Sequence, residues 1–270
     1  MSVDGPAMLS SNPYRLQLVD VVSTYEESGR RLVALDGLSL AVGVGEFVAL
    51  VGPSGSGKST LLDIVAGLLS PDRGAVLIDG EPTNAAQRLG RSAYMQQRDL
   101  LLPWRTAVGN AALALEAAGI GRASAQHQAA AQLGRFGLED FANAYPAQLS
   151  GGMRQRTAFL RTILPGKNLL LLDEPFGALD TLTRAELQAW LAGIWEQDRS
   201  SVLLVTHDVE EAIFLADRVV VLTPRPGRIA HERTVSLPRP RSRDMIASAA
   251  FLADRAILLA ALGVISGSPA

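Results

Sequence analysis

The sequence contains no cysteine. That absence excludes disulfide bonds, thiolate metal sites and a thiol nucleophile. Only three histidines are present, so we do not expect a transition-metal site built from protein ligands alone. The sequence also lacks an apolar run of the ~18 residues that suggests a membrane-spanning helix. Residues 1–13 have neither the basic head nor the apolar middle of a secretory signal, and we expect them to form a disordered tail.

Neither sign of charge is in large excess, because 25 basic and 27 acidic residues leave a formal net charge of −2. Such a balance gives no general attraction to nucleic acid or anionic lipid, so we expect no nucleic-acid partner. Lysine is scarce, since Lys58 and Lys167 are the only lysines in the chain, and a lysine at position 58 therefore needs its own reason. With 48% hydrophobic and 19% charged residues among 270, the chain can form a packed core.

The apolar pattern predicts an alternation of strands and helices. Residues 14–22 and 32–42 alternate loosely between apolar and polar side chains, as strands with one wet face do. Residues from about 105 to 163 are alanine-rich with helical spacing and predict an all-helical insertion. Beyond Pro224 the chain is rich in proline and arginine up to Arg243, and it then has a helical pattern. Further strands are expected at 46–51, 74–79, 93–95, 169–172, 202–205 and 218–222, the last completing the core, with helices at 59–69, 184–195 and from 209.

A glycine-rich segment joins the strand expected at 46–51 to the helix expected at 59–69. It matches the phosphate-binding pattern G-x-x-x-x-G-K-[ST] in the strand–loop–helix setting that this pattern requires. The glycines let successive backbone N–H groups surround an anion, and the helix directs its positive end at the phosphates. Lys58 supplies a compact charge for the β- and γ-phosphates, and the Ser59 hydroxyl would bind Mg²⁺. The predicted ATP-binding residues of this loop are Gly52, Pro53, Ser54, Gly55, Ser56, Gly57, Lys58, Ser59 and Thr60.

A second motif ends the strand expected at 169–172 with Asp173 and Glu174. Ligands bind at the carboxyl ends of the strands in open α/β sheets. Asp173 is placed to hold Mg²⁺, directly or through water, and Glu174 is placed to polarise the attacking water as general base. Alone, this string could be a strand followed by a turn. Together with the phosphate loop it predicts a P-loop nucleoside triphosphatase.

A third motif, formed by Leu149, Ser150, Gly151 and Gly152, opens a predicted helix. Here the chain resembles the ABC ATPase family, whose signature is commonly LSGGQ, although Met153 replaces the usual glutamine. A Ser-Gly-Gly string can merely cap a helix. However, one nucleotide does not need two anion-binding helix ends from the same subunit. We therefore expect Ser150, Gly151 and Gly152 to act in trans, on the nucleotide of the neighbouring copy in a homodimer.

The resemblance implies roles for further residues. Tyr25 matches the aromatic residue that stacks on adenine, although it could be an ordinary tyrosine at a strand end. Gln97 matches the Q-loop glutamine, a catalytic residue and a Mg²⁺ ligand beside Ser59 and Asp173. A shift of the match by one residue would assign this role to Gln96 instead. Asp180 belongs to the D-loop segment at 177–180, and His207 matches the switch histidine that contacts the γ-phosphate.

The fold implied by the resemblance is α/β, a P-loop NTPase (RecA-like) core with a mostly parallel sheet. An antiparallel β subdomain near the N-terminus and an inserted all-helical subdomain complete it. We expect one ABC transporter domain over about 14–235. Its core is divided between 14–97 and 166–228, with the helical subdomain at 98–165 and a short C-terminal extension at 229–270.

Residues 101–104, 175–180, 224–227 and 237–241 resemble the nitrate, sulfonate and taurine importer group, which also includes transporters of thiamine pyrimidine precursors. This resemblance implies an ATPase that uses ATP and Mg²⁺ to energise uptake of a small solute: a sulfonate, taurine, nitrate or a pyrimidine. Its partners would be integral membrane permease subunits and, indirectly, an extracytoplasmic solute-binding protein. The chain would lie peripherally on the cytoplasmic face of the inner membrane. Trp104 would dock the permease, unless it is ordinary core.

Two other classes of protein fit the sequence less well. A non-transport ABC ATPase acting in nucleic-acid repair or translation usually has two cassettes, a long coiled-coil insertion or basic arms, and this sequence has none of them. A P-loop GTPase would favour an N-K-x-D motif and a P-loop kinase would need an acceptor site. We find no N-K-x-D motif, and neither class explains residues 149–152.

Overall fold

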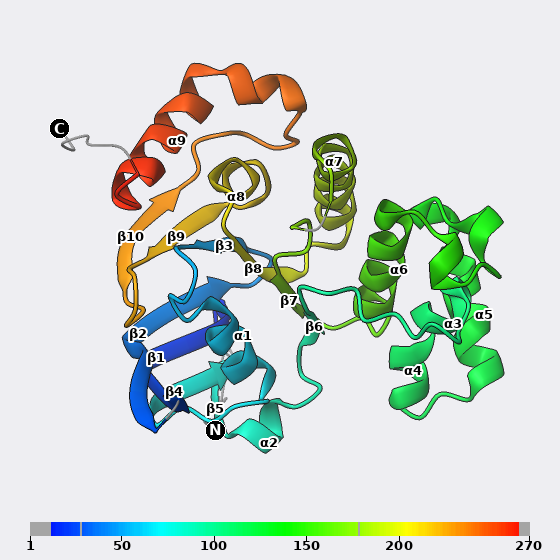
Figure 1. Cartoon of the computed structure of the whole chain (residues 1–270), viewed down its shortest axis with the longest axis horizontal. Helices are drawn as coiled ribbons and strands as arrows, with labels where there is room; N and C mark the ends of the chain where they lie inside the picture. The colour runs from blue at the N-terminus through cyan, green and yellow to red at the C-terminus, as the bar shows by residue number, and fades with distance from the viewer. Residues whose placement is uncertain (1–11, 28, 178, 265–270) are drawn as a thin grey trace, which may run out of the picture.

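The computed structural model describes residues 12–27, 29–177 and 179–264. Residues 1–11 of the predicted tail and Ala178 of the predicted D-loop segment lie outside the described residues. The strands form two sheets (Figure 1). The six-stranded sheet has the order β10-β9-β3-β8-β7-β6, and the four-stranded sheet has the order β2-β1-β4-β5.

The six-stranded sheet is the mostly parallel sheet that the family resemblance implies. The strands from β9 through β6 pair in parallel. β3, β7 and β8 are buried along their whole length, which explains their continuous apolar sequences. Successive side chains point to opposite faces, so Leu170 packs on one core cluster and Leu171 on the other. The strands are β3 (Phe47–Val51), β6 (Ala93–Met95), β7 (Leu169–Asp173), β8 (Ser201–Thr206), β9 (Arg218–Leu222) and β10 (Ile229–Thr234).

The four-stranded sheet is antiparallel throughout. It consists of β1 (Tyr14–Glu27), β2 (Arg30–Gly43), β4 (Arg73–Ile78) and β5 (Glu81–Thr83), and the short α2 (Ala85–Arg88) follows it. Helix α1 (Lys58–Ala66) lies between the two sheets, because its Leu61 and Ile64 share one core cluster with Leu50 of β3 and Leu38 of β2. This packing fixes the start of α1 at the edge of the six-stranded sheet.

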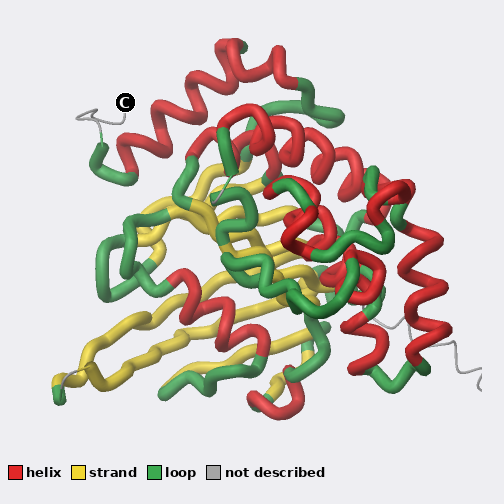
Figure 2. Tube along the Cα trace, turned by 45° about the vertical axis from the view of Figure 1, so that its right-hand side comes forward, coloured by secondary structure: helices red, strands yellow, loops and turns green. Residues whose placement is uncertain are grey.

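Helices α7 (Thr181–Asp198) and α8 (Val209–Leu215) cover the other face of that sheet, above it in Figure 1. The predicted all-helical insertion is confirmed. It consists of α3 (Ala107–Ala111), α4 (Leu113–Ala117), α5 (Arg122–Gln132) and α6 (Gly151–Ile163), with 3-10 turns at Gly134–Phe136, Glu139–Phe141 and Pro146–Gln148. These helices form a separate group beside the strands (Figures 1 and 2). Phe159 of α6 meets Trp190 of α7 edge to face, with ring centroids 5.6 Å apart.

The prediction that residues 218–222 complete the core is wrong. Strand β10 pairs with β9 in antiparallel orientation and extends the sheet by one edge strand. Its burial alternates as a strand's should, but His231 and Arg233 occupy two of its half-buried positions, so the sequence shows no apolar alternation. A 3-10 turn (Arg243–Ala247) and α9 (Ala249–Ala261) follow, and α9 packs against α8 and β10. Within residues 12–27, 29–177 and 179–264, no helix has both the length and the apolar character that crossing a bilayer requires.

Candidate functional site

Four neighbouring parallel strands end at the same edge of the six-stranded sheet. β3, β8, β7 and β6 lie side by side, and their last residues are Val51, Thr206, Asp173 and Met95. The residues that the sequence singles out follow directly after these ends. Parallel strands bring their carboxyl ends together, and the structure therefore gathers the phosphate loop, Glu174, Gln97 and His207 in one place.

The phosphate loop depends on glycine at two positions. Gly55 and Gly57 have φ angles of +78° and +91°, a region that side chains with a Cβ rarely adopt. At Gly57 there is also no space, because a Cβ would lie 2.7 Å from Leu35 Cδ2 and 2.8 Å from the Ala34 carbonyl oxygen. Helix α1 begins immediately afterwards, at Lys58. The loop thus turns tightly beneath the positive end of a nine-residue helix.

The Lys58 ammonium lies inside this loop. Nζ donates to the carbonyl oxygens of Gly52 and Pro53 at 2.8 and 2.9 Å, and to Ser56 Oγ at 3.4 Å. Burial lowers the pKa of Lys58, while the carboxylates of Glu174 and Asp173 raise it. The site therefore holds a buried cation whose present partners are two backbone carbonyls and a serine hydroxyl, which a phosphate could replace.

Asp173 and Ser59 lie in hydrogen-bond contact across the gap between β7 and α1. Burial raises the pKa of Asp173, the hydrogen bond with Ser59 lowers it, and the nearby carboxylates of Glu174 and Asp63 raise it. Asp63, which the sequence reasoning missed, also has its pKa raised by burial, and it is hydrogen-bonded to Tyr94. Asp63 lies among apolar residues of α1, and nothing in the sequence signals this contact.

These residues suit Mg²⁺. Hydroxyl and carboxylate oxygens are the ligands this ion prefers, and it commonly takes only one or two protein carboxylates beside phosphate oxygens. In the part of the chain that the structure describes, no group of three or more His, Asp or Glu side chains could hold a metal ion. A bound nucleotide would have to supply the remaining oxygens.

Two side chains contact the Glu174 carboxylate. Gln97 Nε2 donates to Glu174 Oε2 at 3.1 Å, and His207 Nδ1 lies 3.2 Å from the same oxygen. Of the two adjacent glutamines, Gln97 makes this contact. Glu174 has a φ of +43°, a left-handed conformation that is unusual for glutamate and is common at functional sites. Its backbone N–H donates to the Val205 carbonyl at 2.8 Å, which ties β7 to β8 at this point.

Tyr25 lies on β1 and is 37% exposed. The guanidinium carbon of Arg225 lies 5.4 Å from its ring centroid, and Arg225 Nε donates to the Gly55 carbonyl at 3.3 Å. Arg225 is a residue that sequence reasoning missed. It follows β9, far from Tyr25 in the chain, and no motif links the two positions.

The signature residues begin helix α6. Ser150 is its N-cap, and Ser150 Oγ accepts a hydrogen bond from the Met153 N–H at 3.2 Å. Asp180 caps α7 in the same way, accepting from the Leu182 and Thr183 N–H groups. Gly152 faces Thr183 so closely that a Cβ would lie 2.8 Å from Thr183 Cγ2. In Figure 1, α6 and α1 lie apart, with β6 and β7 between them. Within one chain the two helix N-termini are therefore separate.

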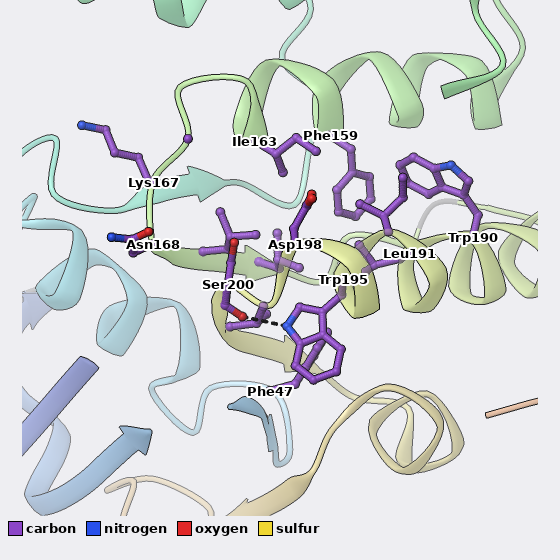
Figure 3. Close-up of a pocket in the computed structure, with 15 residues that line it drawn as sticks. Phe47, Phe159, Ile163, Lys167, Asn168, Trp190, Leu191, Trp195, Asp198 and Ser200 are labelled. Atoms are coloured by element: carbon purple, nitrogen blue, oxygen red, sulfur yellow. Dashed lines mark hydrogen bonds between the residues drawn. The ribbon is translucent and has the colours of Figure 1, made fainter. Parts of the chain in front are cut away.

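A cavity of about 310 Å³ lies elsewhere, between α6, α7 and the face of the six-stranded sheet (Figure 3). Its walls include Phe159, Trp190 and Trp195, and its rim includes Asn168 and Ser200, which precede β7 and β8. Trp195 Nε1 donates to the Ser200 carbonyl at 2.7 Å, the dashed line in Figure 3. Residues at the amino ends of the strands thus line the cavity, and the phosphate loop, Glu174, Gln97 and His207 are not among its lining residues.

Three comparisons identify what the chain resembles. A family described as ABC transporter matches residues 35–177. The chain is 44% identical over 250 residues to the aliphatic sulfonates import ATP-binding protein SsuB of Cupriavidus pinatubonensis, covering 92% of this chain and 78% of that protein. It is 44% identical over 202 residues to the taurine import ATP-binding protein TauB of Rhizobium johnstonii, covering 74% and 76%. A dimeric structure of the ATP-binding cassette MJ0796 with ADP and Pi, in a post-hydrolysis state, has a TM-score of 0.72 and 33% identity, covering 83% of this chain and 100% of that one.

Proposed function

This chain belongs to the ABC transporter family, and from that premise we propose that it is the ATP-hydrolysing subunit of an importer for a small sulfonate such as taurine. The observation that carries the proposal is the convergence at one sheet edge. There, a phosphate loop with a buried lysine lies beside Asp173 and a glutamate contacted by both Gln97 and His207.

Each residue of this edge has a distinct role in the proposed hydrolysis. The loop N–H groups and Lys58 bind the β- and γ-phosphates of ATP. Mg²⁺ at Ser59, Asp173 and Gln97 would neutralise charge on those phosphates. Glu174 orients the attacking water and takes its proton. Gln97 and His207 hold the Glu174 carboxylate, and His207, which is 61% exposed, can turn to the γ-phosphate when ATP is bound.

The second helix N-terminus acts on a partner's nucleotide. Ser150, Gly151 and Gly152 begin α6, which lies away from α1 in the same chain. Asp180 and Thr183 lie beside them, so the D-loop would share the same interface. The dimeric state of MJ0796 supports a homodimer in which each ATP lies between the phosphate loop of one protomer and Ser150 of the other. Such a two-fold arrangement makes two equivalent sites from one sequence.

The permease docks beside the helical insertion. Trp104 and Leu100 follow the Gln97 segment and are 71% and 50% exposed. An open groove of about 490 Å³ lies between β6 and the inserted helices, lined by residues that include Tyr94, Leu113 and Arg161. Arg161, which lines this groove, donates to the Leu100 carbonyl at 2.9 Å. An exposed tryptophan and an apolar groove are both features that a short helix of a partner protein can engage. The chain would thus be held peripherally at the cytoplasmic face of the membrane.

The solute itself is proposed from the relatives. Two of them are import proteins named for aliphatic sulfonates and for taurine, which favours sulfonates over nitrate or a pyrimidine. In such a system the solute passes through the permease, so the side chains of this chain do not select it. A solute-binding protein delivers it from outside.

The test is uptake by the assembled transporter. The chain is reconstituted into proteoliposomes with its permease and solute-binding protein, and labelled taurine, an alkanesulfonate, nitrate and a thiamine pyrimidine precursor are offered separately. We expect ATP-dependent uptake of taurine or the alkanesulfonate, and none with Lys58→Ala. ATP-dependent uptake of nitrate or the pyrimidine alone would refute the sulfonate assignment. ATP hydrolysis that no solute or permease stimulates would refute the importer role.

A further inference from the structure

The loop between β9 and β10, residues 223–228, lies directly against the phosphate loop. β9 pairs in parallel with β3, so Leu222 and Val51 end at the same sheet edge. A Cβ on Gly52 would lie 3.1 Å from Leu222 Cβ, and a Cβ on Gly227 would lie 2.1 Å from the Ser56 carbonyl oxygen. Glycine is therefore needed at position 227, a Cβ at position 52 would be crowded, and the 223–228 loop forms one wall of the candidate nucleotide site.

Hydrogen bonds hold the 223–228 loop in place. The Gly227 N–H donates to the Ala34 carbonyl at 2.8 Å, and the Asp36 N–H donates to the Gly227 carbonyl at 3.2 Å. Within the loop, the Thr223 hydroxyl donates to the Pro226 carbonyl at 2.9 Å and accepts from the Arg228 N–H at 3.0 Å. The backbone that carries Arg225 is therefore fixed against both β2 and the phosphate loop.

Arg225 extends from this fixed backbone to both halves of the site. Its Nε contacts the Gly55 carbonyl at 3.3 Å, and its guanidinium carbon lies over the Tyr25 ring at 5.4 Å from the centroid. Arg228 of the same loop pairs instead with the carboxylate of Asp36. The guanidinium of Arg225 is thus placed between an exposed aromatic ring and the loop that would hold the phosphates.

We propose that Arg225 is the second wall of the base site, so that the purine of the nucleotide inserts between the Arg225 guanidinium and the Tyr25 ring. This inference rests on the proposed function, since it presumes that a nucleotide binds at the phosphate loop. Flat groups stack at ~3.5 Å, so a base between ring and guanidinium needs about 7 Å. The guanidinium must then withdraw by about 1.5 Å from its present position, a change that rotation about the arginine side-chain bonds provides.

The chemistry of the two walls determines what they recognise. A ring and a guanidinium both contact the flat faces of a base and leave its hydrogen-bonding edges free. The pair therefore favours a purine by its large π surface, and it contributes to affinity through the base alone. The substitution Arg225→Gln keeps a donor for the Gly55 carbonyl but removes the positive charge and the planar guanidinium group. Loss of Arg225 should weaken binding of a nucleotide and leave binding of its phosphate chain unchanged.

The test compares a probe with a base and a probe without one. Dissociation constants for Mg-ATP and Mg-tripolyphosphate are measured by titration calorimetry on the full chain and on Arg225→Ala, Arg225→Gln and Arg228→Ala. We expect Arg225→Ala and Arg225→Gln to raise the dissociation constant for ATP by about 3- to 10-fold. The constant for tripolyphosphate should change by less than about 2-fold. Arg228→Ala, a matched removal of an arginine from the same loop, should leave the ratio of the two constants unchanged.

Two outcomes would overturn the proposal. Equal weakening of both probes in Arg225→Gln would show that Arg225 acts on the phosphates or on the phosphate loop. Unchanged ATP affinity in both Arg225 variants would show that the guanidinium makes no contact with the base. Wild-type protein that binds neither probe would instead refute the proposed function, so the two failures are distinguishable. Thermal melting of each variant confirms that the fold is intact before titration.

Discussion

Replacing Glu174 with glutamine removes one charge and one proton acceptor from the centre of the site. The carboxylate oxygen Oε2 is contacted by Gln97 Nε2 at 3.1 Å and by His207 Nδ1 at 3.2 Å. A glutamine side chain has the same shape, and its amide oxygen can accept from the same two groups. The backbone at Glu174 is held by its own hydrogen bond to Val205. We therefore expect Glu174→Gln to fold normally and to bind ATP with a dissociation constant within a few-fold of the wild-type value.

Hydrolysis should respond very differently. An amide cannot take a proton from water, and a positioned base contributes about 10² to 10⁴ in rate. We expect the turnover of Glu174→Gln to fall by at least about 10²-fold, which corresponds to about 2.7 kcal/mol of activation free energy. Phosphate release is measured at saturating Mg-ATP, and ATP affinity is measured separately. Glu186→Gln, the same change on the exposed face of α7, is the matched control and should be neutral. Turnover above a tenth of wild type, or a loss of ATP affinity as large as in Lys58→Ala, would refute this division of roles.

Three further predictions concern coupling and stability. Trp104→Ala should leave basal ATP hydrolysis unchanged and reduce solute uptake in the reconstituted transporter; an unchanged ratio of uptake to hydrolysis would contradict permease docking at this residue. Burial raises the pKa of Glu211 to about 7, above its unfolded value. The folded state therefore favours the protonated carboxyl, which stabilises the fold at low pH. This stabilisation is lost as pH rises through 7. Glu211→Gln should therefore flatten the fall in unfolding free energy between pH 5 and 8, by up to about 3 kcal/mol; equal slopes in both proteins would contradict this. Asp254 is fully buried and accepts hydrogen bonds from Arg233 and the Ser236 N–H, so Asp254→Ala leaves these donors unpaired and should cost about 1–3 kcal/mol in urea unfolding. The change at the exposed Asp244, Asp244→Ala, should cost little, and equal effects would contradict the assignment.

The sequence alone was sufficient to predict those structures that are determined by a single short segment. The glycine pattern at 52–60 specifies a tight loop before a helix, and the structure has Gly57 at φ +91° with α1 starting at Lys58. The leucine run at 169–172 specifies a strand buried on both faces, and β7 is buried throughout. Because the carboxyl ends of parallel strands lie at one sheet edge, the sequence predicts that Glu174, Gln97 and His207 share this edge. The strand order that makes them neighbours comes from the structure.

The sequence alone was insufficient to predict structures that depend on residues outside the segment itself. The helix expected at 184–195 begins at Thr181, because Asp180 caps it. β10 could not be predicted, since its side chains do not alternate in polarity and its only reason to be extended is pairing with β9. Arg225 meets Tyr25 because the 223–228 loop is held against β2, which pairs with the strand β1 that carries Tyr25. The domain boundaries and the roles of the individual site residues remain predictions.

In the proposed homodimer, two copies of this chain complete each other's nucleotide sites. Sedimentation of Glu174→Gln at saturating Mg-ATP tests it most directly, because uncleaved ATP should join the phosphate loop of one protomer to Ser150, Gly151 and Gly152 of the other. The double variant Glu174→Gln with Ser150→Arg places a bulky side chain at the N-terminus of α6, which lies apart from the phosphate loop of its own chain. We predict an ATP-dependent dimer for the single variant, and a monomer that still binds ATP for the double variant. A single variant that stays monomeric with ATP bound, or a double variant that dimerises equally well, would contradict the account.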